Sequence, residues 1–343
     1  MVNTNRGIMA KAVATVLVTG ALIAASSRIL AAPADPEERN LIVQEARSAL
    51  LAEDLDKLES LSGRFRREKS RTSSGLWKLT IFYAGIYAAC SDVAKDNEQA
   101  WTSLEQHAQA WAEKYPQSPS AHISVSVVSM CHAWAIRGRG YANTVPPEAW
   151  EGFHRYIALT RDNLMVHKAV ASVDPAWYQE MLFVAAHQGW PRSEFDSLLT
   201  EALQREPYYY QTYFAAMAYL LPKWHGSIDD IERFANDAVE RTKQDEGRSM
   251  YARIYWSVSQ GQFRGRLFQE SRADWPKMKA GFDDILARYP DRWNINNYAW
   301  FACLAGDRAT TKALLPRVGE TPLEEVWKPA ASFGRCRMWA TEG

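Results

Sequence analysis

Apolar residues recur along this sequence with the spacing of an α-helix, and no other feature constrains the fold as strongly. In four stretches, which begin at Trp101, Phe195, Ile231 and Phe282, apolar side chains return about every three or four positions. This spacing places them along one face of a helix. No stretch alternates apolar and polar residues cleanly with the period of two that marks a half-buried strand. The sequence therefore predicts an all-α protein.

One segment resembles a strand. Residues 123–128 read Ile-Ser-Val-Ser-Val-Val, which alternates, but this stretch leads into Met130 and Trp134 and also suits a helix built from small residues. We predict a helix there, because a short apolar run cannot be assigned by its period alone.

Prolines separate the predicted helices. The four that do so most clearly are Pro116, Pro175, Pro207 and Pro290. A residue before proline is pushed out of α geometry, so each position closes one helix or opens the next. The 32-residue step from Pro175 to Pro207 is close to the period of a tetratricopeptide unit, and it contains two helical patterns, over residues 176–188 and 193–204.

The repeats are degenerate, because unit lengths vary and the full tetratricopeptide signature is absent. We predict a tetratricopeptide-like solenoid of helical hairpins, in which neighbouring hairpins bury a shared core. The 14 Trp and 15 Tyr residues suit this fold, since large rings fill the seams between helices. The predicted parts are residues 1–34, an N-terminal helical part over 35–145 and a helical array over 146–343.

The first 34 residues have the plan of a secretory signal peptide. Arg6 and Lys11 precede an apolar run over residues 12–25, and small residues follow up to Ala34. We predict cleavage after Ala34, or earlier after Ser26, and a periplasmic or secreted protein. The alternative is an uncleaved anchor in the inner membrane that leaves the chain facing the periplasm.

Four cysteines are compatible with an oxidising compartment. They are Cys90, Cys131, Cys303 and Cys336, and none forms a C-x-x-C motif. We predict the pairs Cys90–Cys131 and Cys303–Cys336, because neighbouring helices in a stacked array bring together residues a few tens of positions apart. The alternative is four small buried thiols.

Charge and motifs exclude several classes of function. Beyond the first 34 residues the chain carries 37 basic against 40 acidic residues, a net charge of −3. Proteins that bind nucleic acids usually carry an excess of basic residues, so this charge argues against nucleic-acid binding. The sequence contains neither H-E-x-x-H nor G-x-S-x-G, and His122 and His132 do not share a helical face. We therefore predict no catalytic residue, no metal site and no cofactor.

Two loops rich in Gly and Pro carry the candidate binding residues. In residues 137–147 these are Arg137, Arg139 and Tyr141, where two guanidinium groups beside flexible backbone suit an anion. The alternative is a structural turn whose arginines pair with acidic helix ends.

The second loop, residues 221–227, offers Lys223, Trp224 and His225 for stacking and charge-assisted hydrogen bonds. The alternative is a tryptophan folded back onto the helices. A further candidate is Tyr209, because three consecutive tyrosines cannot share one helical face and at least one ring should be exposed or face a groove.

Four motifs resemble those of an uncharacterised bacterial family, a domain of unknown function with tetratricopeptide-like helices. They are residues 133–142, 174–178, 220–227 and 251–255, and the resemblance spans roughly residues 40–310. It implies an all-α fold and a bacterial origin. It brings no established activity and no site residue.

These observations favour an exported helical-repeat protein that holds a protein or peptide partner on its concave face without catalysis. Neither nucleic acid nor, apart from an uncleaved N-terminal segment, a membrane is an expected partner. The alternative is an envelope enzyme or small-ligand binder with its pocket at the 137–147 and 221–227 loops. Convergence of Arg137, Arg139, Trp224 and His225 in one deep pocket would favour that alternative.

Overall fold

The protein is all-α, as predicted. The structure, a computed structural model, describes residues 35–138, 140 and 142–342. These residues form 17 α-helices and no β-strand, with one isolated bridge between Arg71 and Trp77. None of the described helices has the length and apolar character needed to cross a bilayer. The predicted signal segment, residues 1–34, lies outside the described residues.

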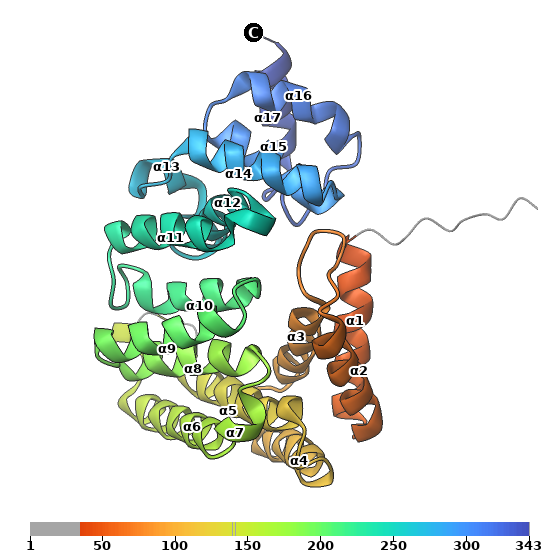
Figure 1. Cartoon of the computed structure of the whole chain (residues 1–343), viewed down its shortest axis with the longest axis vertical. Helices are drawn as coiled ribbons and strands as arrows, with labels where there is room; N and C mark the ends of the chain where they lie inside the picture. The colour runs from red at the N-terminus through yellow and green to blue at the C-terminus, as the bar shows by residue number, and fades with distance from the viewer. Residues whose placement is uncertain (1–34, 139, 141, 343) are drawn as a thin grey trace, which may run out of the picture. The chain divides into compact units, whose positions relative to one another are not determined.

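The helices follow one another along the chain in the order drawn in Figure 1. The first nine are α1 (Asp35–Leu51), α2 (Leu55–Glu68), α3 (Lys78–Ser91), α4 (Glu98–Lys114), α5 (Pro119–Arg137), α6 (Pro147–Val166), α7 (Lys168–Ala171), α8 (Ala176–Gln188) and α9 (Arg192–Arg205). The others are α10 (Tyr210–Leu220), α11 (Ile228–Glu246), α12 (Ser249–Val258), α13 (Leu267–Glu270), α14 (Trp275–Arg288), α15 (Arg292–Leu304), α16 (Arg308–Val318) and α17 (Ala331–Thr341). Short 3-10 turns occur at Ala142–Thr144 and Arg264–Arg266, and a π-helical turn at Ser259–Phe263.

Local sequence signals place many helix ends. The predicted helices over 176–188 and 193–204 correspond to α8 and α9, and residues 123–128 lie within α5. Helix α11 begins where Ser227 accepts a hydrogen bond from the backbone N–H of Asp230 at 3.1 Å, a typical N-cap.

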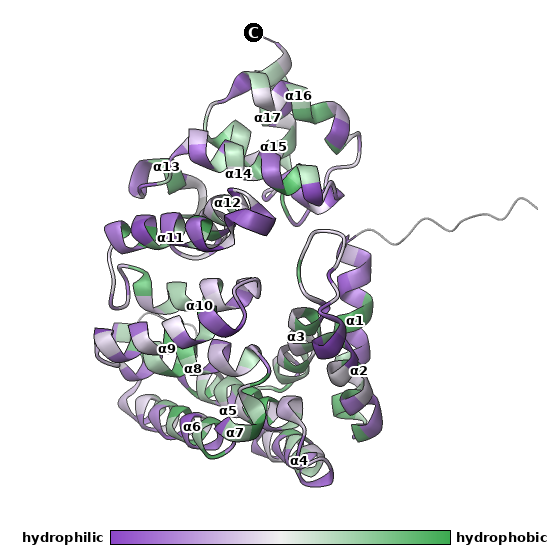
Figure 2. Cartoon of the chain, in the orientation of Figure 1, coloured by the Kyte–Doolittle hydropathy of each residue, from purple (hydrophilic) through white to green (hydrophobic). Residues whose placement is uncertain are grey.

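Helices α5, α8, α10 and α12 contact one another in turn, and α6, α9, α11 and α14 pack beside them. Helices α8 and α12 are buried on nearly every side, whereas α11 buries a single stripe and shows a largely hydrophilic surface in Figure 2. The described residues form one compact unit, and α5 and α6 pack extensively across the predicted boundary at residue 145.

The segment that joins α2 to α3, residues 69–77, lies across the beginnings of helices far away in sequence, and we call it the strap. Ser73 donates a hydrogen bond to Asp291, just before α15, at 2.8 Å. The carbonyl of Ser74 accepts hydrogen bonds from Arg253 of α12 and Asn294 of α15. At Gly75, where φ is +96°, the ring of Tyr289 leaves no room for a Cβ atom.

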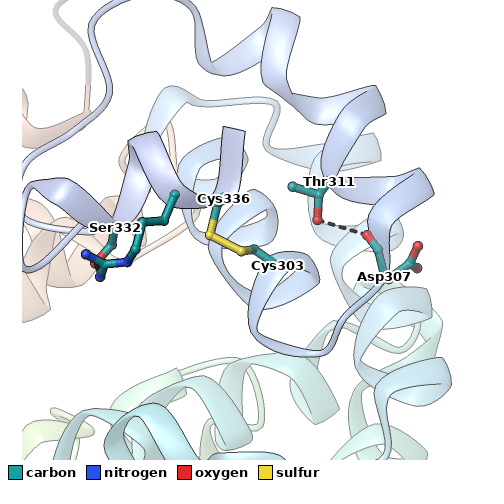
Figure 3. The surroundings of a disulfide bond; sticks show 6 residues. Cys303, Asp307, Thr311, Ser332 and Cys336 are labelled. Carbon is teal, nitrogen blue, oxygen red and sulfur yellow. Dashed lines mark hydrogen bonds between the residues drawn. A yellow bond between two sulfur atoms is a disulfide. The ribbon is translucent and has the colours of Figure 1, made fainter. Parts of the chain in front are cut away.

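Cys303 of α15 and Cys336 of α17 form a disulfide with a Cα–Cα distance of 5.9 Å, as drawn in Figure 3. Asp307, which caps α16, accepts a hydrogen bond from Thr311 beside it. The other predicted bridge is not formed: Cys90 and Cys131 are free thiols.

Candidate ligand-binding site

The guanidinium of Arg137, the last residue of α5, contacts aromatic rings and backbone carbonyls close to it in the sequence. Its guanidinium lies 5.0 Å from the ring centre of Trp134 and 4.7 Å from that of Trp150. The same group donates to the carbonyls of Gly138 and Gly140 at 2.9 and 3.2 Å. These contacts close the turn, so Arg137 acts in the structure as a packed, half-buried residue.

The second loop packs against the first through His187 of α8. The His187 ring lies 5.2 Å from Trp134 and 5.7 Å from the half-buried Trp224, both edge-on. His225 is exposed and its Nε2 lies 2.8 Å from the carbonyl of Ala186, while Lys223 is exposed. Trp134, Arg137, Trp150, His187 and Trp224 together are called the loop cluster.

The environment of His187 shows how closed the loop cluster is. Burial and, to a smaller extent, the nearby charges of Arg137 and His225 together lower the pKa of this imidazole to about 4. Residues of both predicted loops therefore lie near His187: Arg137 of the first, and Trp224 and His225 of the second. The cavity described below takes none of its walls from Arg137, Trp224 or His225.

The prediction for Tyr209 is wrong. Its side chain is 0 % exposed, because the strap residue Trp77 covers it edge-on at 5.5 Å. Its hydroxyl donates to Gln179 at 3.4 Å. Tyr208 is the member of the tyrosine run that stays half-buried. Two further candidates, Arg139 and Tyr141, lie outside the described residues.

A cavity of about 320 Å³ lies between α1, the strap, α10, α12 and α15. Its main polar walls are Arg39, Ser74, Gln211, Arg253, Gln260 and Asn294. Its apolar walls are Leu76, Phe214, Trp256 and Trp293. We call it the Arg253 cavity, because Arg253 is its most unusual wall.

Arg253 is a buried cation without an anion. It lies on the fully enclosed helix α12 and is 4 % exposed. It donates to the carbonyl of Ser74 at 3.3 Å and lies 4.6 Å from the ring centre of Tyr210. Its Nε has no hydrogen-bond partner, and among the described residues no carboxylate lies within 4.0 Å of it. Burying an unpaired charge is costly, so this site favours an anion.

The acidic residue near this part of the core is already shared. Glu246 is 4 % exposed and lies 3.7 Å from Arg71 and 3.8 Å from Arg288. Two arginines therefore compete for one carboxylate before Arg253 is counted. The Arg288 side chain is 44 % exposed, so Glu246 mainly compensates Arg71, and Arg253 stays without a carboxylate within 4.0 Å among the described residues.

Arg39, the other cation of the cavity, is compensated. It forms an ion pair with Asp35 one turn earlier in α1, and its guanidinium lies 4.5 Å from the ring centre of Trp293. Asp35 in turn accepts from the backbone N–H of Ser74 at 3.1 Å. Arg39 thus holds one rim of the cavity to the strap, and Arg253 is the charge that remains.

Neutral polar groups complete the cavity. Asn294 donates from Nδ2 to the carbonyls of Ser74 and Tyr289, and its Oδ1 is buried without a partner. Gln260 comes from the π-helical turn that follows α12. Such turns occur often at functional sites, because they redirect side chains within a helix. Together these groups can hydrogen-bond a polar ligand beside the charge of Arg253.

Sequence reasoning did not select Arg253. The one signal available was an arginine inside a stretch of α12 that is otherwise apolar or aromatic, from Met250 to Trp256. A charge in a helix buried on all sides needs a partner or a ligand. Among the described residues, no group of three His, Cys, Asp or Glu side chains has the geometry to hold a metal ion.

No protein-family model matches this sequence, and neither a curated protein nor a solved structure is detectably similar to it. The functional assignment therefore depends on the geometry of the Arg253 cavity itself.

Proposed function

We propose that this chain is a binding protein for a small organic anion, whose charged group lies against Arg253. The observation that carries the proposal is a guanidinium that is 4 % exposed, has no carboxylate partner among the described residues and lines a cavity of about 320 Å³. A carboxylate or similar anion would supply the negative charge that the described residues do not place beside Arg253. Its hydrogen bonds to the guanidinium would be charge-assisted and therefore strong.

The apolar walls support a ligand with a compact, flat apolar body. Trp256 and Trp293 stack on each other with ring centres 6.2 Å apart, and Phe214 comes from α10. Aromatic walls of this kind give a ligand a large contact area. The cavity volume suits a molecule of about the size of benzoate, because ligand pockets enclose most of the ligand surface.

Binding is a better account than catalysis. The walls of the Arg253 cavity include amides, serines, two arginines and aromatic rings, but none of the described ones is a carboxylate, imidazole or thiol. Acid–base chemistry needs such a group within hydrogen-bond reach of the substrate. Two serines without a base beside them do not make an activated nucleophile.

This proposal keeps the predicted solenoid and replaces the predicted peptide partner with a small ligand. Successive hairpins such as α8–α9 and α10–α11 support a tetratricopeptide-like array. However, the strap lies across the beginnings of α10 and α15 and over Arg253 in the middle of α12, so it covers this face of the array. A small ligand beneath the strap fits this arrangement better than an extended partner.

The proposal includes the predicted export to the periplasm or beyond. The Cys303–Cys336 bond supports it, because stable disulfides are typical of proteins outside the reducing cytoplasm. Fractionation of cells that express the chain, with N-terminal sequencing of the product, tests this part. An unprocessed product in the cytoplasm would contradict the proposed export and would leave the ligand proposal unaffected.

The ligand proposal is tested by titration calorimetry with benzoate and with benzamide, which has a similar shape and no charge. We expect benzoate to bind, and benzamide to bind at least about tenfold more weakly, because hydrogen bonds to charged groups contribute about 1.5–3 kcal/mol. Replacement of Arg253 by methionine should lower benzoate affinity about ten- to hundredfold. The matched variant Arg137→Met, in the loop cluster, should leave it unchanged.

Three results would overturn the proposal: no benzoate binding at millimolar concentration, equal binding of benzoate and benzamide, or an unchanged affinity in Arg253→Met. Circular dichroism checks that the variant is folded. Should it unfold, Arg253→Lys retains the charge without the planar donor pair, and it is expected to show a smaller loss.

A further inference from the structure

A second cavity, of about 630 Å³, brings both free cysteines together. Its walls come from α3, α4 and α5 and include Tyr87, Cys90, Trp101, Cys131 and Trp134. It shares no wall with the Arg253 cavity, so an inference drawn from it is independent of the proposed function.

The two thiols are neighbours on packed helices. Cys90 is the penultimate residue of α3, and Cys131 lies in the second half of α5, which packs directly against α3. Both side chains line the same cavity, and Cys90 raises the pKa of the Cys131 thiol. A disulfide needs the Cα atoms of its cysteines within about 7 Å of each other, which positions on two directly packed helices can satisfy.

The thiols differ in access. Cys90 is 5 % exposed, whereas Cys131 is partly exposed and faces the cavity. A reagent that enters the cavity therefore meets Cys131 first. Cys90 also lines the cavity but is more deeply buried, which suits a resolving thiol.

Groups around Cys131 keep its thiol protonated. Burial raises the pKa of the Cys131 thiol well above its usual value, and Cys90 and Glu180 of α8 raise it further. Tyr87 donates to the two carboxylate oxygens of Glu180 at 2.8 and 2.7 Å, next to the thiols. The side chain of Lys95 is the cation at the cavity wall. A protonated thiol is a poor nucleophile, so the pair stays reduced until the pH rises or a disulfide reaches it.

We infer that Cys90 and Cys131 form a reversible dithiol–disulfide site that exchanges with small-molecule disulfides entering this cavity. Cys131 loses its proton to solvent, and its thiolate attacks one sulfur of the incoming disulfide and releases one thiolate. Cys90 then loses its proton and attacks the Cys131 sulfur of the mixed disulfide, which releases the second thiolate. Two electrons pass to the incoming disulfide, which becomes two thiols, and the chain gains one S–S bond.

The test uses the full chain in mixtures of 2-mercaptoethanol and its oxidised form, hydroxyethyl disulfide. Free thiols are trapped with N-ethylmaleimide, and each cysteine is assigned by peptide mass spectrometry. We expect Cys90 and Cys131 to pass from free thiols to a bridge as the mixture becomes more oxidising, while Cys303–Cys336 stays closed throughout. The rate of bridge formation should rise about tenfold per pH unit at neutral to mildly alkaline pH, because it follows the thiolate fraction.

Two variants test the order of attack. Cys90→Ser should accumulate a mixed disulfide on Cys131, because no resolving thiol remains. Cys131→Ser should react much more slowly at Cys90, which is buried. The inference is wrong if no Cys90–Cys131 bridge forms in the folded chain, if Cys90 reacts as fast as Cys131, or if both cysteine pairs open and close together.

Discussion

Arg253 and Arg137 are both surrounded by aromatic rings, but they lie in different kinds of site. Arg137 is half-buried at a surface loop and gives two hydrogen bonds to carbonyls of that loop, at 2.9 and 3.2 Å. Arg253 is 4 % exposed and reaches one carbonyl, that of Ser74. In both residues Nε is buried without a partner. Two loop carbonyls compensate the half-buried Arg137, whereas the deeply buried Arg253 has one carbonyl, and this is the basis for proposing a ligand there.

The comparison shows that aromatic contacts alone do not identify a binding arginine. Ring centres lie 4.7 and 5.0 Å from the Arg137 guanidinium, and 4.6 and 5.7 Å from that of Arg253. Cation–π contacts of this kind stabilise an arginine in either role. What differs is the number of carbonyls that accept from the guanidinium and the burial of the side chain. The packing of the loop cluster favours a structural role for it, and the Arg253 cavity is the stronger candidate for binding.

The largest expected effect comes from the loop cluster. Trp224→Ala removes a ring that packs against His187 and should lower the free energy of unfolding by about 3 kcal/mol, at the low end for a tryptophan because Trp224 is half-buried. Urea unfolding measures this loss. Benzoate affinity of the folded variant should stay unchanged. A variant with normal stability and lost benzoate binding would reverse the roles of the two regions.

His187 gives the second effect, which depends on pH. Its pKa is about 4 in the folded chain and near 6.5 when unfolded, so the unfolded state binds the extra proton first as the pH falls. Stability present above pH 6.5 is lost between about pH 6.5 and 4, by up to about 3 kcal/mol. His187→Gln should remove this loss, so the variant's unfolding free energy should fall less on acidification than that of the wild type.

A second buried group, Glu180, titrates in the same pH range, so the His187→Gln variant is needed to isolate the effect of His187. Burial raises the pKa of its carboxyl from 4.5 to about 7, so its contribution to stability is full below pH 4.5 and is lost as the pH rises to about 7. This trend opposes that of His187 over the same range. The wild-type profile alone is therefore uninformative, whereas the difference between wild type and His187→Gln isolates the imidazole. Parallel profiles for the two proteins would show that His187 is not closed off from water.

Local signals predicted much of the fold but little of the site. Helices α8 and α9 were predicted to within a residue at each end, because Pro175 and Pro207 punctuate the chain around them. Tyr209 was predicted wrongly, because Trp77, more than a hundred positions earlier, covers it. Periodicity describes one helix at a time and does not show which distant segment lies on its end.

The Arg253 cavity was missed for the same reason. The arginine stands in α12, but the strap supplies the Ser74 carbonyl and α15 supplies Asn294. Whether a buried arginine has a partner depends on these distant segments. The binding residues were predicted in the loops rich in Gly and Pro, because loops often bind ligands. In this fold those loops close on themselves, and the unpaired charge lies on a regular helix.

The smallest expected effect sharpens the comparison most, because it adds a charge without removing a contact. Gln211 lies in the first turn of α10 and lines the Arg253 cavity. Gln211→Glu keeps the side-chain shape and places a carboxylate in the same cavity as Arg253. This carboxylate would act as an internal anion and should lower benzoate affinity about tenfold, with no loss of stability, since an acidic residue suits a helix N-terminus.

The matched control is Gln188→Glu, at the end of α8 near the loop cluster, where the side chain accepts a hydrogen bond from Trp190 at 3.0 Å. It adds the same charge and should leave benzoate affinity unchanged, since Arg137 does not bind the probe. Calorimetry at one salt concentration compares the two variants directly. Equal losses would mean that benzoate responds to the net charge of the chain, and the distinction between Arg253 and Arg137 would then fail. A loss in Gln211→Glu alone would show that the anion and the new carboxylate compete for one buried guanidinium.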